Sequence, residues 1–141
     1  MRILAVDPGD KNIGIALSDP TNTLASPLTI IKHLSRPLDA ARIAALALEN
    51  QVELILVGQS IDEEGLPSPQ GRKAARLAAA IRDQTTIPIQ LWDESFSTQS
   101  AKAASIEMNI PRKKRRGHLD NLAAASILQS YLDTLHDHNT P

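Results

Sequence analysis

The strongest constraint on the fold is the start of the chain, where an apolar run, a turn and an alternating run follow one another. Residues 3–6 are continuously apolar, which is typical of a strand buried on both faces of a sheet. Pro8, Gly9 and Asp10 then give a turn signal, and residues 12–18 alternate between larger apolar side chains and small ones. The sequence therefore predicts a sheet that begins with an antiparallel hairpin.

The remainder of the chain alternates between strand and helix patterns. Further strands are expected at residues 24–31, 53–58 and 87–92, and Pro27 favours an edge or a bulge for the first of these. Helices are expected at residues 37–49 and 72–83, from Ser97 or Thr98 to about Met108, and at about 119–135. Residues 60–71 are expected to form a long, mobile surface loop. This order predicts an α/β fold with a mixed five-stranded sheet, later strands parallel and helices on both faces. Ligands should bind at the carboxyl ends of the parallel strands.

Length and composition exclude several classes of protein. A chain of 141 residues suits one domain, which we expect to cover residues 1–135, with residues 136–141 as a frayed tail. No stretch approaches the roughly 18 apolar residues of a membrane span, so no membrane partner is expected. The chain has no cysteine, which excludes thiol catalysis and cysteine-ligated zinc. A cytoplasmic location is expected.

The basic residues are unevenly distributed. The net charge is −1, from 15 basic and 16 acidic residues, but five of the basic residues are consecutive: Arg112, Lys113, Lys114, Arg115 and Arg116. Without this basic segment the balance is 10 against 16, or −6, so an acidic body carries one concentrated basic segment. The segment is either a solvated loop or a nucleic-acid contact. Aromatic residues make up only 2%, too few for a base-stacking platform.

Three carboxylates stand where a buried apolar residue would be expected. Asp7 ends the first apolar strand, and Glu94 follows the last strand next to Asp93. Asp120 is expected in the first turn of the last helix, on the face that continues through Ala124. Each acid alone has a structural explanation, as a turn residue, a strand end or a favourable charge at a helix start.

Together, these carboxylates predict a metal site. Buried acids can converge only if a cation or basic groups neutralise them. Oxygen ligands without histidine or cysteine suit Mg²⁺ or Mn²⁺. Two such ions about 3.5–4 Å apart are the machinery of in-line phosphodiester hydrolysis. Near this site, Lys11 would contact a phosphate as a point charge, and Gly14 would permit close approach of a ligand to the backbone.

Several short segments together match the pattern of one known family. They are Asp7-x-Gly9-x-Lys11-x-x-Gly14-x-Ala16, Val57-Gly58, Asp93-Glu94-x-x-Ser97-Thr98, and Leu119-Asp120-x-x-Ala123-Ala124 with Ile127-Leu128-Gln129. On these segments the chain resembles the YqgF (RuvX) family over nearly its whole length.

The resemblance implies a fold, an activity and a set of residues. The family has a ribonuclease-H-like fold, is similar to Holliday-junction resolvases, and is described as nucleases that mature the 5′ end of the 16S ribosomal RNA precursor. It implies catalytic and metal-ligating roles for Asp7, Glu94 and Asp120, with Glu94 preferred over Asp93 as the family's glutamate. Gly9, Gly14 and Gly58 are the positions of close backbone approach. Lys11 and the basic segment are the expected nucleic-acid contacts.

The sequence departs from the family pattern at three points, and other functions stay open. Asn12 and Ser95 stand where the family generally has arginine, and Gln59-Ser60 replaces Leu-Pro. The absence of these arginines would remove phosphate contacts. The alternatives are a junction-resolving DNA endonuclease, a non-catalytic nucleic-acid-binding module, or a fragment of a nucleotide-binding ATPase that opens with a similar hairpin. The expected partners are structured RNA of the ribosomal precursor, branched DNA or pre-ribosomal particles, bound by a monomer or weak homodimer.

Overall fold

The computed structural model describes the backbone of residues 1–96 and 112–137 and the side chains of residues 1–95 and 122–136. The helix expected from Ser97 or Thr98 to Met108, and residues 138–141, lie outside this description. The strands are β1 (Arg2–Pro8), β2 (Asn12–Ser18), β3 (Ala25–Lys32), β4 (Val52–Gln59) and β5 (Ile89–Asp93). The helices are α1 (Arg36–Glu49), α2 (Pro69–Arg82), the short 3₁₀ helix η1 (Glu94–Phe96) and α4 (Arg112–Asp137).

The five strands form one mixed sheet in the order β3-β2-β1-β4-β5. β1 pairs antiparallel with β2, and β2 with β3, while β4 runs parallel to both β1 and β5. β3 is an edge strand, and its register with β2 shifts beside Pro27, as a residue without a backbone donor requires. The predicted hairpin, edge strand and parallel pairs are all confirmed.

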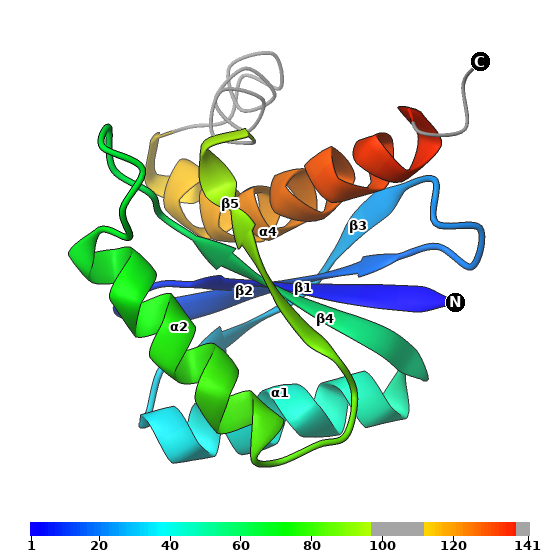
Figure 1. Cartoon of the computed structure of the whole chain (residues 1–141), viewed down its shortest axis with the longest axis horizontal. Coiled ribbons are helices and arrows are strands. Elements are labelled where there is room, and N and C mark those ends of the chain that lie inside the picture. Colours follow the sequence, from blue (N-terminus) through cyan, green and yellow to red (C-terminus); the bar gives the residue numbers. More distant parts are fainter. Residues whose placement is uncertain (97–111, 138–141) are drawn as a thin grey trace.

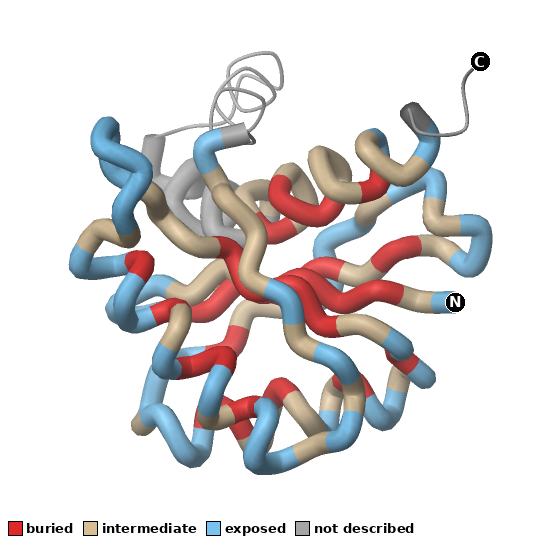
Figure 2. The backbone as a smooth tube through the Cα atoms, in the orientation of Figure 1, coloured by how far each residue is buried: buried red, intermediate tan, exposed pale blue. Residues whose placement is uncertain are grey.

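Helices cover both faces of the sheet, as predicted (Figure 1). α1 and α2 pack on one face, where they bury a cluster that includes Leu4, Val6, Ile15, Val57 and Ile81. α4 packs on the other face over Ile3, Ala5 and Leu56. Buried backbone therefore runs through the middle of the sheet and the inner sides of all three helices (Figure 2). Among the described residues, no helix is long and apolar enough to cross a membrane.

The segment between β4 and α2 is shorter than the sequence suggested and is held by its own hydrogen bonds. α2 begins at Pro69 rather than Arg72, because the Ser68 side chain accepts a hydrogen bond from the Gly71 amide (3.1 Å) and proline suits the first helical turn. In the remaining loop, Asp62 accepts hydrogen bonds from the amides of Glu64 and Leu66 (both 2.9 Å). The expectation of a long loop reaching residue 71 is therefore wrong.

The last helix is longer than predicted at both ends. It begins at Arg112, so the basic segment is helical rather than a loop, and Asp120 lies in the third turn instead of the first. A proline is compatible with the position just before or at the start of a helix, and Lys and Arg are good helix formers. The helix also continues through Asp137, and the His136 ring donates a hydrogen bond to the carbonyl of Asn22 (2.9 Å).

Candidate active site

The carboxyl ends of β1 and β4 present small and acidic residues toward α4. Ile3 and Ala5 of β1 contact the α4 side of the core, and by strand alternation Asp7 faces the same side. Asp7 pairs in register with Gly14 of β2, and Val6 pairs with Val57, the residue before Gly58. At this end of the sheet three adjacent strands therefore carry Asp7, Gly14 and Gly58, two of which have no side chain.

Glu94 reaches this group across β4. A Cβ atom at Gly58 would stand 3.5 Å from Glu94 Oε2 and 3.5 Å from the Val6 carbonyl oxygen. The Glu94 carboxylate thus lies over Gly58, beside the end of β1 from which Asp7 follows. β5, which precedes Glu94, is not a neighbour of β1, because β4 lies between them. At 3.5 Å a Cβ atom at Gly58 would be in ordinary van der Waals contact with Glu94 Oε2, so the carboxylate lies directly over the intervening strand.

The structure distinguishes the two neighbouring acids at the end of β5. Asp93 accepts a hydrogen bond from the Ser95 amide (2.9 Å), so its carboxylate stabilises the start of η1. Glu94 is the acid that lies against Gly58 on the α4 side. Burial, with a smaller contribution from the Asp93 charge, raises the pKa of Glu94 above its ordinary value. A cation bound beside Glu94 would stabilise the charged carboxylate and so lower this raised pKa.

α4 covers this end of the sheet and carries the third acid. Ile127 of α4 stands over Gly58, with Cδ1 only 2.6 Å from the point a Cβ atom would occupy there. Asp120 lies two turns before Ile127 on the same helix, and its side chain is outside the described residues. Contacts fix the helix at both edges of the sheet: Trp92 Nε1 donates to Ser130 Oγ (2.9 Å), and the Ala25 amide donates to Gln129 Oε1 (3.0 Å).

The donor set at this end of the sheet fits a hard divalent cation. Asp7 and Glu94 supply carboxylate oxygens, and Asp120 is on the helix that covers them. Within the described side chains, no three acids, histidines or cysteines group closely enough to hold a metal ion. Side chains are described for two of the three predicted ligands, Asp7 and Glu94.

The turn after Asp7 has little steric freedom. A Cβ atom at Gly9 would stand 2.4 Å from the Asn12 carbonyl oxygen, so only glycine fits this tight connection. Lys11 is exposed at its tip, and the His33 amide donates to its carbonyl oxygen (2.8 Å). Sequence reasoning assigned Gly58 to ligand approach, but the side chains that approach it are those of Ile127 and Glu94. Before the strand order is known, the sequence offers no signal for these contacts.

The packing over Gly58 gives a first prediction. Gly58→Ala should lower the free energy of unfolding by about 1–3 kcal/mol, because the new methyl group overlaps Ile127 Cδ1 in a buried contact. Urea unfolding measures this loss. Ile127→Val removes the overlapping atom, so the double variant should be more stable than Gly58→Ala. A double variant that gains nothing would show that Ile127 does not oppose a side chain at position 58.

The raised pKa of Glu94 gives a second prediction. The folded state holds the proton more tightly than the unfolded state, so the free energy of unfolding of the metal-free protein should fall as pH rises from about 4.5 through the raised pKa. Glu94→Gln removes this fall and should be the more stable form at neutral pH. Urea unfolding across this range measures it, with Glu53→Gln at an exposed glutamate as control. A stability difference that does not change with pH would contradict the prediction.

The chain shares its fold class with Holliday-junction resolvases of known structure. The chain is similar in fold to Thermus thermophilus RuvC in complex with a Holliday junction substrate, with a TM-score of 0.62 and 14% identity over 95% of this chain and 96% of that one. It is also similar to the fowlpox virus resolvase in complex with Holliday junction DNA, with a TM-score of 0.57 and 18% identity over 96% and 99%. These similarities confirm the ribonuclease-H-like fold.

Sequence comparison identifies the family within this class. Residues 1–134 match the sequence model of the RuvX family, described as "Holliday junction resolvase", and the chain belongs to that family. A protein of Thermoanaerobacter pseudethanolicus is 43% identical over 95% of this chain and 97% of its own length, and one of Desulforamulus reducens is 40% identical over 95% and 98%. Both carry the name "Putative pre-16S rRNA nuclease". The predicted family is therefore confirmed.

Proposed function

We propose that the protein is a metal-dependent endonuclease that cleaves structured RNA at the 5′ end of the 16S ribosomal RNA precursor. The observation that carries this proposal is the Glu94 carboxylate lying over Gly58, beside the strand end that bears Asp7. Family membership and the names of the two relatives support a nuclease and the RNA substrate. The protein would act in the cytoplasm on pre-ribosomal particles.

In this proposal Asp7, Glu94 and Asp120 hold Mg²⁺ or Mn²⁺. The bound ions would activate a water molecule and stabilise the charge that develops on the scissile phosphate. In this proposal the Glu94 carboxylate is positioned over Gly58, next to the point where Ile127 of α4 packs on that glycine. Lys11 and the basic segment would hold the flanking phosphates, offsetting the repulsion between an acidic centre and a polyanion.

A second candidate is a junction-resolving DNA endonuclease. The similarity in fold to two junction resolvases and the family description favour it. A resolvase cuts two strands symmetrically and normally works as a dimer, so a strictly monomeric protein would argue against this candidate. A non-catalytic binding module, suggested by Asn12 and Ser95 in place of arginines, would bind nucleic acid and leave it intact.

One cleavage assay separates these candidates. The purified protein is incubated with RNA that spans the 5′ end of the 16S precursor and with a four-way DNA junction, in Mg²⁺, Mn²⁺ or EDTA. We expect cleavage of the RNA that requires the metal and is abolished in Asp7→Asn. Cleavage of the junction alone favours the resolvase, and binding without cleavage of either substrate favours the binding module.

A further inference from the structure

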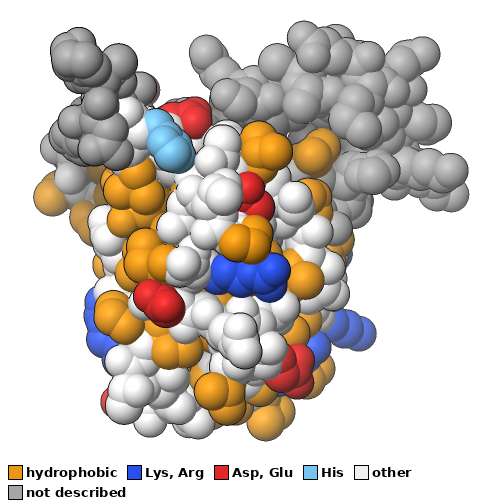
Figure 3. Space-filling view, turned by 90° about the vertical axis from the view of Figure 1, so that its right-hand side faces the viewer, with side chains coloured by type: hydrophobic (Ala, Val, Ile, Leu, Met, Phe, Trp, Pro, Cys, Tyr) orange, Lys and Arg blue, Asp and Glu red, His pale blue; other side chains and the backbone are white. Residues whose placement is uncertain are grey.

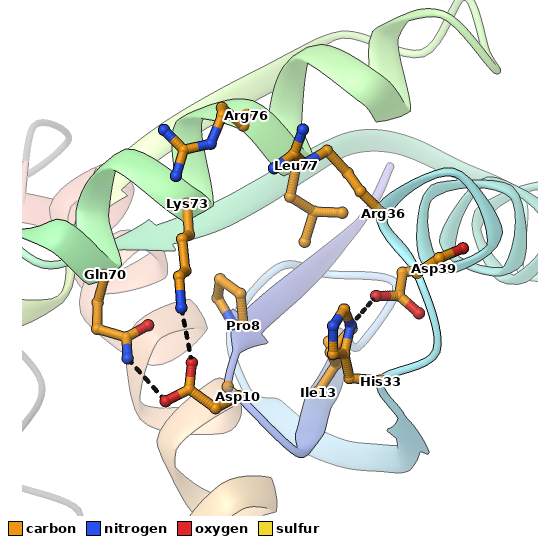
Figure 4. Close-up of a pocket in the computed structure, with 12 residues that line it drawn as sticks. Pro8, Asp10, Ile13, His33, Arg36, Asp39, Gln70, Lys73, Arg76 and Leu77 are labelled. Carbon is orange, nitrogen blue, oxygen red and sulfur yellow. Dashed lines mark hydrogen bonds and ion pairs between the residues drawn. The ribbon is translucent and has the colours of Figure 1, made fainter.

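A pocket of about 450 Å³ lies on the opposite face of the sheet from Asp7 and Glu94. It opens between the first turns of α1 and α2 and is closed below by the end of β1 and the turn that follows (Figure 4). Its lining combines apolar side chains, among them Pro8, Ile13 and Leu77, with a group of charged residues. The proposed cleavage reaction uses none of its side chains.

The acids of this pocket already accept hydrogen bonds from other residues of the protein. Asp10 accepts hydrogen bonds from Gln70 Nε2 (3.0 Å) and Lys73 Nζ (3.3 Å) of α2. Asp39 is only 2% exposed, accepts a hydrogen bond from the Leu34 amide (3.0 Å) and pairs with His33 Nδ1. Both carboxylates are therefore committed to protein groups.

Two basic side chains of the pocket are not committed. Within the described part of the chain, neither Arg36 nor Arg76 makes a side-chain hydrogen bond or an ion pair, although both line the pocket from different helices (Figure 4). By contrast, Arg42 and Arg82 on the same two helices donate to the carbonyls of Lys32 (2.8 Å) and Ile89 (3.3 Å). Two guanidinium groups at one pocket are suited to a phosphate, whose oxygens accept paired hydrogen bonds from arginine.

The other residues of the pocket limit which kind of phosphate-containing molecule could bind there. The start of α1 cannot supply amide donors freely, because Ser35 Oγ and the Ser35 carbonyl already accept from Leu38 and Asp39. At this helix start, a phosphate would therefore be bound by side chains rather than by backbone amides.

The pocket volume lies in the usual range of small-ligand sites. Ile13 and Leu77 are only 1% and 6% exposed, so the half-buried Pro8 offers the apolar surface for a sugar or a base. Arg36 and Arg76 lie together at this pocket. By contrast, at the end of the molecule where β1 begins, hydrophobic, acidic and basic side chains are interspersed (Figure 3).

We propose that this pocket binds a nucleotide, with its phosphate on Arg36 and Arg76 and its sugar and base against Pro8. The same phosphate ester is offered by a free nucleotide and by a nucleotide residue of an RNA strand. The site is separate from the metal centre, but the turn between β1 and β2 connects the two. Asp10 is held by α2, and the carbonyl of Lys11 accepts from the His33 amide, so the turn that follows Asp7 also borders this pocket.

The test measures binding in EDTA, so that it does not depend on cleavage or on the metal centre. AMP, inorganic phosphate and a labelled unstructured RNA are titrated into wild type, Arg36→Gln/Arg76→Gln and the matched control Arg42→Gln/Arg82→Gln. The pocket variant should bind AMP and phosphate at least about tenfold more weakly, and the control should bind them as wild type does. As a measurement independent of variant folding, phosphate added to wild type should shift the backbone amide resonances of Gly9 and Gln70.

The RNA titration distinguishes the two sources of phosphate. If the slope of log affinity against log salt for RNA becomes shallower by about 0.7 or more in the pocket variant only, the pocket holds a nucleotide of the RNA strand. If only AMP and phosphate binding falls, it holds a free nucleotide. The proposal is overturned if wild type binds neither AMP nor phosphate and the RNA slope is unchanged, or if both double variants lose binding equally.

Discussion

Replacing Asp7 with Asn should lower the cleavage rate by at least about 100-fold while the metal-free protein stays as stable as wild type or becomes more stable. Losing one metal ligand removes several kcal/mol of transition-state stabilisation, and each 1.36 kcal/mol is tenfold in rate. Without a cation, however, Asp7 lies at the end of β1 on the same face of the sheet as the Glu94 carboxylate over Gly58, and like charges repel. The same substitution should therefore separate activity from stability.

The measurement pairs cleavage rates with urea unfolding of the metal-free protein. Asp83→Asn is the control, because this exposed acid at the end of α2 gives the same charge change far from the site. It should cleave at close to the wild-type rate. An Asp7→Asn protein that loses stability and activity together would mean that Asp7 is mainly a structural turn residue.

Replacing all five residues of the basic segment with Gln should weaken nucleic-acid binding broadly and reduce its dependence on salt. Removing one phosphate contact lowers the log-affinity against log-salt slope by about 0.9 for a duplex and about 0.7 for a single strand. Because the segment forms the first turns of α4, the helix fixes its position relative to Asp120. Fold and metal affinity should change little, since glutamine is also a good helix former.

The helical register allows a sharper version of this experiment. Lys113 and Arg116 precede Asp120 by seven and four residues, so these positions fall on the same side of α4 as Asp120, whereas Lys114 and Arg115 fall on the other side. Replacing the first pair with Gln should reduce affinity and slope more than replacing the second pair, which makes the same charge change. Unchanged affinity and slope in the five-residue variant would mean that the basic segment is only a solvated surface.

Local pattern was sufficient for most of the fold. The apolar run before Asp7, the alternation in residues 12–18 and the position of Pro27 correctly predicted a hairpin with an edge strand. Each of these features depends on neighbours close in sequence. The predicted start of α4 was wrong because a proline followed by five charged residues resembles a loop when only neighbours in sequence are considered. The packing of the later turns of α4 on the sheet could not be seen from that local pattern.

The site was predictable only in part, because its geometry depends on strand order. The family pattern selected Glu94, but nothing in the sequence showed that its carboxylate lies across β4 over Gly58. The pocket on the other face brings together Asp10, Arg36 and Arg76 from segments far apart in the chain. No spacing rule connects such residues before the topology is known.

The most direct test of the metal site is the anomalous difference density of a crystal of the protein soaked in Mn²⁺. We predict a peak at the carboxyl ends of β1 and β4, on the α4 side, with the carboxylates of Asp7, Glu94 and Asp120 in direct coordination at about 2.0–2.2 Å, close to the distances known for a hard divalent ion. Density elsewhere on the molecule, or an Asp120 carboxylate that points to a different surface, would contradict the proposed metal site.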